Sequence, residues 1–174
     1  MSSIPFDLNK IKAFAFDVDG VLSTSTIPLH PSGEPMRMIN IKDGYAIQYA
    51  VKQGYPIAII TGGKTDAVRK RFDGLGITDI YLGASAKLPI FESWIKKHNL
   101  TREDVLFMGD DIPDMEIMKI TGLPAAPKDA ACDIIDIAKY ISPFNGGEGC
   151  VRDVIEQTLK AQGKWMSDKK AFGW

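Results

Sequence analysis

The chain has 174 residues, of which 45% are hydrophobic and 25% are charged, so it is long enough for one domain with a core of its own. Its 21 basic and 22 acidic side chains give a net charge of −1, and this near balance argues against a protein that attracts nucleic acid or an anionic membrane. No apolar run is as long as a membrane-spanning helix, and the first residues do not follow the pattern of a signal peptide. We therefore expect a cytoplasmic protein whose two cysteines, Cys132 and Cys150, are reduced core residues.

Strand and helix patterns alternate along the chain. Short apolar runs predict strands over 11–16, 56–60, 79–82, 105–108, 123–125 and 139–141. Apolar residues at helical spacing, or charged runs ended by glycine, predict helices over 44–53, 65–73, 86–98, 113–120 and 151–159. Such alternation is typical of an α/β fold with a doubly wound, Rossmann-like parallel sheet. We expect a single domain over residues 1–174, without repeats or linkers.

The segment 22–43 interrupts this alternation. Three prolines and a glycine are followed by apolar Met36, Met38 and Ile41 in a strand-like alternation, which predicts a projecting β-hairpin over 22–41. A disordered surface loop is the alternative. A small hairpin has little core of its own, so we expect either that a neighbouring chain covers these side chains or that the segment is mobile.

The first predicted strand ends in Asp17 and Asp19, followed by Gly20. In an open α/β sheet the carboxyl end of a strand is where ligands bind. Two carboxylates this close repel each other and are costly to bury unless a cation lies between them. A solvated Asp-Gly turn is the alternative for this motif taken alone.

Polar residues follow three more of the predicted strands at the same edge of the sheet. They are Thr61 with Gly62, Lys87, Asp110 with Asp111, and Asp114 one turn later. Aspartates in this number predict a hard divalent cation such as Mg²⁺, and the hydroxyl, the glycine N–H and the lysine suit a phosphoryl group. Each residue alone could be a helix cap or an exposed ion pair, but four successive strand ends make coincidence a poor explanation.

These four motifs, in this order, resemble those of the haloacid dehalogenase superfamily, and within it the small cap-less sugar-acid phosphatases. The narrower resemblance rests on the segments 40–45, 146–153 and 161–164. Thr61 follows Asp19 by 42 positions and Lys87 follows Thr61 by 26, which leaves no room for a cap domain in either interval. The resemblance covers nearly the whole chain.

The resemblance assigns a role to each motif. Asp17 would be the nucleophile that forms an aspartyl-phosphate, and Asp19 the general acid and then the general base. Thr61, Gly62 and Lys87 would hold the phosphoryl group. Magnesium would bind to Asp17, to the backbone carbonyl of Asp19 and to Asp110, with Asp111 or Asp114 in support.

The resemblance also implies a substrate. We expect hydrolysis of the terminal phosphate of 3-deoxy-D-manno-octulosonate 8-phosphate, a step of lipopolysaccharide sugar synthesis, with a nine-carbon nonulosonate 9-phosphate as the alternative. Relatives often carry arginine or another charged residue where this chain has Gly63, so part of the recognition must come from other residues. The candidates are Lys64, Arg69 and Arg152.

The resemblance further implies a homotetramer in which the hairpins pack centrally and the C-terminal region of one subunit covers the site of its neighbour. Arg152 and the tail 163–174 would then contact the substrate, while a solvated Arg152 and a disordered tail are the alternative. The glycine turn 146–149 would let the backbone approach a ligand closely.

Two other classes of protein combine some of these residues. A receiver domain also clusters aspartates, threonine and lysine around Mg²⁺, but its phosphorylated aspartate lies on a middle strand. A non-catalytic module of the kind fused to sugar-acid nucleotidyltransferases has typically lost the nucleophile, whereas Asp17 and Asp19 are both present here. We therefore expect an enzyme.

Overall fold

The computed structural model describes residues 2–173, so Met1 and Trp174 of the expected domain lie outside it. Within that range six strands form one sheet in the order β3-β2-β1-β4-β5-β6, and every neighbouring pair is parallel. The strands are β1 (Ala13–Phe16), β2 (Ile57–Ile60), β3 (Asp79–Tyr81), β4 (Val105–Met108), β5 (Leu123–Ala126) and β6 (Tyr140–Ile141). This order confirms the doubly wound sheet expected from the sequence.

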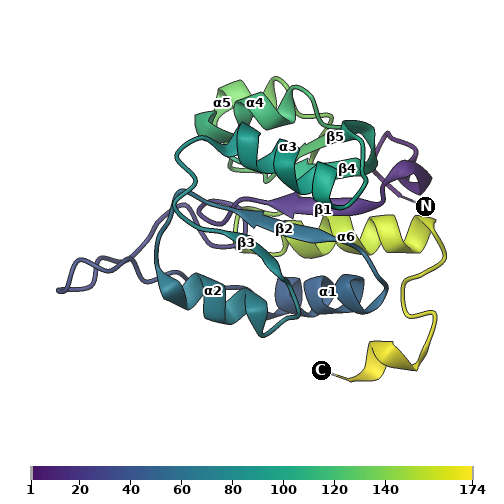
Figure 1. Ribbon diagram of the computed structural model, residues 1–174, viewed down its shortest axis with the longest axis horizontal. Coiled ribbons are helices and arrows are strands. Elements are labelled where there is room, and N and C mark those ends of the chain that lie inside the picture. The colour runs from purple at the N-terminus through teal and green to yellow at the C-terminus, as the bar shows by residue number, and fades with distance from the viewer. Residues whose placement is uncertain (1, 174) are drawn as a thin grey trace.

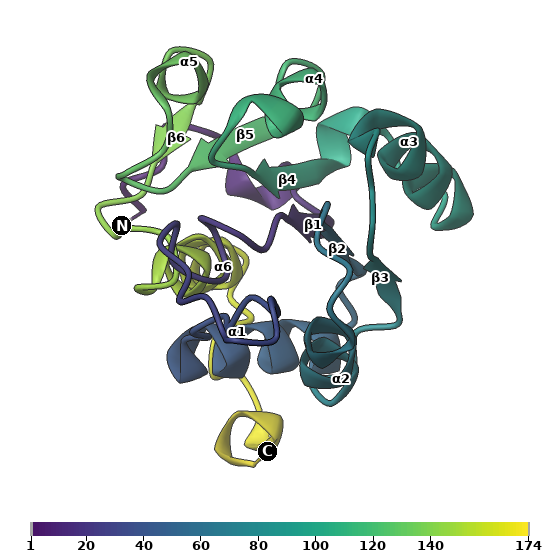
Figure 2. The ribbon, with the colours of Figure 1, turned by 90° about the vertical axis from the view of Figure 1, so that its left-hand side faces the viewer.

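Helices cover both faces of the sheet (Figures 1 and 2). One face carries α1 (Ile41–Lys52), α2 (Asp66–Asp73) and α6 (Cys150–Ala161), and the other carries α3 (Lys87–Lys97), α4 (Met115–Met118) and α5 (Cys132–Ile135). Short 3₁₀ turns are η1 (Leu8–Lys10), η2 (Arg102–Asp104), η3 (Ile112–Asp114) and η4 (Lys169–Phe172).

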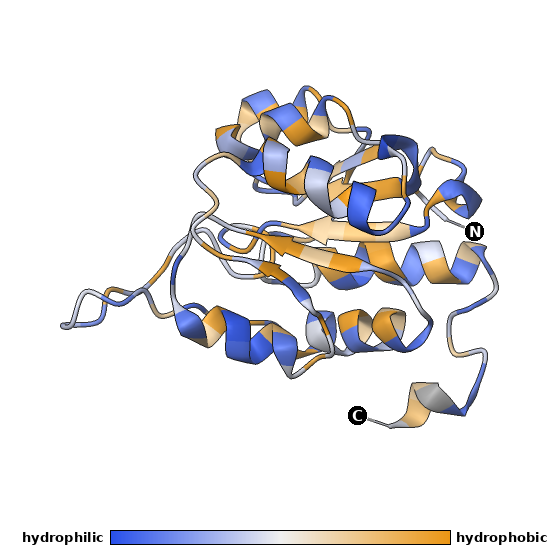
Figure 3. Ribbon diagram, viewed as in Figure 1, coloured by the Kyte–Doolittle hydropathy of each residue, from blue (hydrophilic) through white to orange (hydrophobic). Residues whose placement is uncertain are grey.

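The strands are buried on both faces, which explains why they read as continuous apolar runs. In β1, Phe14 and Phe16 belong to the core beneath α1 and α6, whereas Ala13 and Ala15 belong to the core beneath α3. Figure 3 shows the apolar residues concentrated in the strands between the two helix layers. β1 thus presents aromatic residues to one helix layer and small residues to the other.

The order of the strands reverses at β1, which lies between β2 and β4. Phe16, the last residue of β1, pairs with Ile59 of β2 and with Met108 of β4. The residues that follow these three strands therefore leave the sheet side by side. In doubly wound folds this reversal is the place where ligands bind.

The segment between β1 and α1 projects from the sheet, as Figure 1 shows, but it is not the regular hairpin that the alternation predicts. Outside the named strands it forms only isolated bridges, including the antiparallel pairs Ser23 with Ile39 and Leu29 with Pro35. Ile41 begins α1 instead of ending the hairpin, because Asn40 caps that helix by accepting the N–H groups of Lys42 and Asp43.

Three smaller expectations also need correction. The helix predicted over 113–120 is the turn η3 followed by the short helix α4, and the four-residue helix α5 was not predicted. Both cysteines are free thiols as expected, but only Cys150 is buried, whereas Cys132 is exposed. No helix among the described residues has the length and hydropathy needed to cross a bilayer.

The C-terminal tail is ordered against its own chain. The hydroxyl of Tyr49 in α1 donates to the carbonyl of Lys164 at 3.0 Å, and the ring of Tyr49 packs edge-on against Trp165. The hydroxyl of Tyr45 donates to the carbonyl of Ala171. Figure 1 shows the tail beneath α1 and not at the carboxyl ends of the strands.

Candidate active site

The polar residues at the strand ends converge on one cavity of about 530 Å³. Its wall contains Asp17 and Asp19 after β1, Thr61 and Gly62 after β2, Lys87 at the start of α3, and Asp110 and Asp111 after β4. The structure therefore brings together the residues of all four motifs that the sequence singled out.

Lys87 is buried and shared between two carboxylates. Its Nζ lies 2.9 Å from Oδ1 of Asp17 and 2.7 Å from Oδ1 of Asp114. Burial alone would lower the pKa of Lys87, but attraction to Asp17 and Asp114 outweighs it and raises that pKa. The lysine is therefore held as an ammonium ion beside the expected nucleophile.

The carboxylates around Lys87 outnumber it, and their pKa values rise accordingly. Burial first, and repulsion from Asp114 second, raise the pKa of Asp17 to about 7. Burial first, and repulsion from Asp17 second, raise the pKa of Asp110 to about 8. Burial also raises the pKa of Asp114. One lysine does not neutralise two buried carboxylates and a half-buried one, so without a further cation the cluster retains protons.

The same cluster fits a divalent metal ion. Asp17, Asp110 and Asp114 each offer one carboxylate oxygen, and these oxygens lie within 4.8 Å of one another. Oδ1 of Asp110 is buried and accepts no hydrogen bond from the described residues, which leaves it available for a cation. Carboxylate oxygens in this number are typical ligands of Mg²⁺. Asp111 is not one of these three carboxylates, and its own carboxylate accepts the N–H of Ile112 at 2.8 Å.

Gly20 allows the first and fourth motifs to approach this closely. Its φ of +83° lies in the left-handed region, and a Cβ added there would lie 1.9 Å from Oδ2 of Asp110. Any other residue would displace the carboxylate of Asp110. This explains why the paired aspartates are followed by glycine.

Asp19 forms an ion pair with an arginine, Arg37, which the sequence did not predict. Nε of Arg37 lies 2.6 Å from one carboxylate oxygen of Asp19, and its Nη2 lies 2.8 Å from the other. Nη1 of the same guanidinium donates to the hydroxyl of Thr65 at 3.1 Å. The arginine comes from the projecting segment, where no periodic pattern predicts which side chain points toward the site.

The residues expected to recognise the substrate lie elsewhere in the described chain. The exposed Lys64 has its stem beside Gly83, and the exposed Arg69 donates to the carbonyl of Ile80 at 3.2 Å. Neither lines the catalytic cavity. Their role in substrate recognition stays a prediction, which their position within one chain does not explain.

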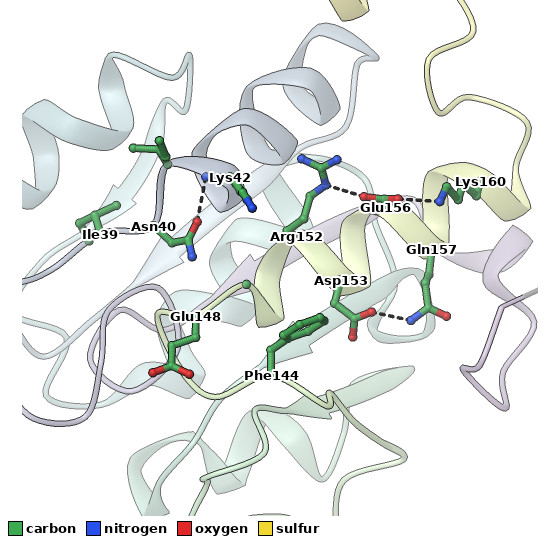
Figure 4. Close-up of a pocket in the computed structure, with 12 residues that line it drawn as sticks. Ile39, Asn40, Lys42, Phe144, Glu148, Arg152, Asp153, Glu156, Gln157 and Lys160 are labelled. Atoms are coloured by element: carbon green, nitrogen blue, oxygen red, sulfur yellow. Dashed lines mark hydrogen bonds and ion pairs between the residues drawn. The ribbon is translucent and has the colours of Figure 1, made fainter.

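Arg152 lines a different, larger cavity of about 740 Å³ near the first turns of α1 and α6 (Figure 4). Its Nε donates to Glu156 at 2.5 Å, and the guanidinium lies 4.6 Å from the centre of the Trp165 ring. Within one chain Arg152 is thus outside the catalytic cavity. A role for it in the site of a neighbouring subunit stays a prediction.

The glycine turn 146–149 packs against the loop that follows β1, and its expected approach to a ligand stays a prediction. A Cβ on Gly146 would lie 1.9 Å from the carbonyl oxygen of Gly20, and the N–H of Gly147 donates to the carbonyl of Val21 at 2.8 Å. Asp43 of α1 supports this contact by accepting the backbone N–H of Arg152 at 2.6 Å in the first turn of α6. Two of the three segments behind the narrower resemblance, 40–45 and 146–153, therefore support the loop that carries Asp19.

Comparisons with known proteins agree with this geometry. Residues 76–155 match the family of haloacid dehalogenase-like hydrolases. The 3-deoxy-D-manno-octulosonate 8-phosphate phosphatase KdsC of Escherichia coli K12 is 40% identical over 154 residues, which are 88% of this chain and 82% of that protein.

Two solved structures of the same kind superpose on this chain. The phosphatase of Yersinia pestis has a TM-score of 0.88 and 34% identity and covers 91% of this chain and 86% of its own. The phosphatase of Moraxella catarrhalis, solved with a magnesium ion, a phosphate ion and KDO, has a TM-score of 0.89 and 31% identity and covers 96% of both chains. The chain thus belongs to the haloacid dehalogenase-like hydrolases, in the family of 3-deoxy-D-manno-octulosonate 8-phosphate phosphatases.

Proposed function

We propose that this chain hydrolyses 3-deoxy-D-manno-octulosonate 8-phosphate to the free sugar acid and phosphate in a Mg²⁺-dependent reaction. The observation that carries the proposal is the position of Asp17, which lies at the end of β1 beside Lys87 in a cavity that also contains Thr61 and Gly62. The family supports the identity of the substrate. The magnesium ion, phosphate ion and KDO bound to the Moraxella protein support the proposal that this chain binds a metal ion, a phosphate group and a sugar acid.

The reaction proceeds in two steps. In the first, a carboxylate oxygen of Asp17 attacks the phosphorus, the bond from phosphorus to the sugar oxygen breaks, and Asp19 gives that oxygen a proton. In the second, Asp19 takes a proton from water, whose oxygen attacks the phosphorus. Phosphate then leaves and Asp17 is regenerated.

The other residues of the cavity bind and orient the phosphoryl group. Thr61 is buried and its hydroxyl accepts the N–H of Gly63 at 3.1 Å, so its orientation is fixed before the ligand arrives. The ammonium group of Lys87 offsets phosphoryl charge. Asp17, Asp110 and Asp114, with the backbone carbonyl of Asp19, would hold Mg²⁺, which when bound offsets the charge of the carboxylates and the phosphate.

A panel of phosphate esters tests this proposal. We expect kcat/KM for the octulosonate 8-phosphate to exceed the values for hexose phosphates and for p-nitrophenyl phosphate, and EDTA to abolish turnover. A higher value for the nonulosonate 9-phosphate would reassign the substrate. Equal values throughout would indicate a general phosphatase, and uptake of one phosphate without turnover would indicate a receiver-like module.

The assembly and the compartment are part of the same proposal. Met36 and Met38 in the projecting segment are 52% and 65% exposed in the single chain, which supports a homotetramer formed around these segments. The near-neutral net charge is compatible with the proposed cytoplasmic location.

A further inference from the structure

Arg37 occupies the space that a side chain at position 63 would need. A Cβ added to Gly63 would lie 2.6 Å from Nη2 of Arg37 and 3.3 Å from its Cζ. A carbon and a nitrogen that are not bonded to each other do not approach to 2.6 Å, so a side chain at 63 would push the end of the Arg37 side chain out of this position. The glycine that departs from the pattern of the relatives is therefore what admits the arginine.

The arginine is a partly buried charge, and not all of its N–H donors are used within the chain. Its side chain is only 8% exposed, and its ion pair with Asp19 uses both oxygens of that carboxylate. A guanidinium has five N–H groups, and three of them are used by Asp19 and Thr65. Arg37 lines a third cavity, of about 460 Å³, between the projecting segment and α2, and it reaches the catalytic cavity through its contact with Asp19.

The ion pair competes with the chemistry assigned to Asp19. Each carboxylate oxygen of Asp19 has one lone pair engaged by the guanidinium, which holds the carboxylate in its ionised form and away from the substrate oxygen that it must protonate. A substrate that carries its own carboxylate can compete for the guanidinium, because a guanidinium fork binds any carboxylate in the same geometry. Binding such a substrate would release an oxygen of Asp19.

We infer that Arg37 is a specificity-determining residue that binds the carboxylate of the sugar acid. It would thereby replace the charged side chain that relatives often carry where this chain has Gly63. The inference rests on the proposed function, since a substrate without a carboxylate would gain nothing from it. It also explains why neither Lys64 nor Arg69 has to reach the cavity.

Substrate discrimination tests this inference. The quantity to measure is the ratio of kcat/KM for the sugar-acid phosphate to kcat/KM for p-nitrophenyl phosphate, which lacks a carboxylate. In Arg37→Ala we expect this ratio to fall about 10- to 100-fold, the range for loss of a charge-assisted hydrogen bond. Gly63→Ala should lower the ratio as well, because the added Cβ displaces the guanidinium. Lys70→Ala removes an equal charge from an exposed pair with Asp66 on α2 and should leave the ratio unchanged.

A double variant provides the positive test. Arg37→Ala combined with Gly63→Arg returns an arginine to the same space from the opposite side, and it should recover part of the lost ratio. Arg37→Lys keeps the positive charge but loses the paired N–H donors of the guanidinium. The ratio of kcat/KM values for this variant should therefore lie between those of the wild type and Arg37→Ala. Calorimetric titration with the free sugar acid should show the same ranking of affinities.

The inference is overturned if Arg37→Ala changes kcat/KM for both esters by the same factor, which would leave Arg37 a residue that only positions Asp19. Unchanged values for both esters would overturn it too. The proposed function is judged separately, on the wild-type panel. If the wild type prefers a different phosphate ester that carries a carboxylate, the ratio is measured with that ester, and an unchanged ratio in Arg37→Ala again refutes the inference. A preference for an ester without a carboxylate would overturn the inference directly.

Discussion

Nζ of Lys87 lies 2.9 Å from a carboxylate oxygen of Asp17, although burial raises the pKa of that carboxyl to about 7. A lysine so close would by itself lower the pKa of an aspartate. Here burial and Asp114, which also contacts the lysine, outweigh it. The site thus concentrates negative charge around the nucleophile, and its stability and activity depend on the cations that neutralise this charge.

The first prediction separates the two aspartates after β1. Asp17→Asn should abolish turnover, because an amide does not form the acyl phosphate, yet the thermal unfolding midpoint should not fall, since the amide is nearly isosteric and removes a repelling charge. Asp19→Asn should lower kcat by roughly 10²- to 10⁴-fold, the usual contribution of one general acid or base. Steady-state kinetics and circular dichroism on both variants test this. Substantial turnover by Asp17→Asn would exclude the covalent route.

The second prediction concerns Lys87. Lys87→Met keeps the length of the side chain but leaves two buried carboxylates without their cation, which should reduce the free energy of unfolding by about 3–5 kcal/mol at pH 8.5. At pH 5 the carboxylates take up protons and the loss should be much smaller. Urea denaturation at both pH values measures it. The matched Lys70→Met, in an exposed pair, should cost less than about 1 kcal/mol at either pH, and equal losses at pH 5 and 8.5 in Lys87→Met would contradict the argument.

The third prediction links pH to metal. The folded protein holds protons on Asp17 and Asp110 up to about pH 7 and about pH 8, whereas the unfolded chain releases them near pH 4. Unfolding therefore releases protons across this window, so the stability of the metal-free protein should fall as the pH rises from about 4 to about 8. Mg²⁺ binds the ionised carboxylates, so the midpoint shift it produces should be larger at pH 8 than at pH 5.5.

Thermal unfolding with EDTA or with Mg²⁺ at a series of pH values measures both effects. Asp110→Asn removes the carboxyl with the higher of these two pKa values. Without metal, the unfolding midpoint of this variant should therefore depend less on pH, and Mg²⁺ should shift the midpoint less. A metal-free midpoint that rises between pH 5.5 and pH 8 would show that these carboxylates are ionised in the folded protein.

The sequence predicted the strand-end residues well for a physical reason. Asp17, Thr61 and Asp110 each follow an apolar strand, and parallel strands bring their carboxyl ends to one edge. The contact between Arg37 and Asp19 could not be predicted in this way, because the projecting segment has only isolated bridges and no period to show where a side chain points. The one-turn helix α5 was not predicted for a related reason, since four residues are too few to show a helical period.

The fourth prediction tests the proposed homotetramer. Met38 is 65% exposed in the single chain, so Met38→Glu should leave the fold of the subunit intact but place a repelling charge in an interface built from the projecting segments. Sedimentation should show a tetramer for the wild type and smaller species for the variant. Ile141→Glu, an exposed apolar residue of the edge strand β6, serves as the control. A monomeric wild type would refute the assembly.

The last prediction concerns the tail. If the C-terminal region of one subunit covers the site of another, truncation after Gln162 should raise KM for the sugar-acid phosphate much more than KM for p-nitrophenyl phosphate, which fits within the phosphoryl site alone. In the single chain this tail packs on α1, where Trp165 contacts Tyr45 and Tyr49, so truncation also exposes these rings. Trp165→Ala reproduces that exposure while keeping the tail. A rise in KM confined to the truncated protein supports coverage of the neighbouring site, an equal rise in Trp165→Ala points to the support of α1 instead, and an unchanged KM in both would show that the tail plays no part in recognition.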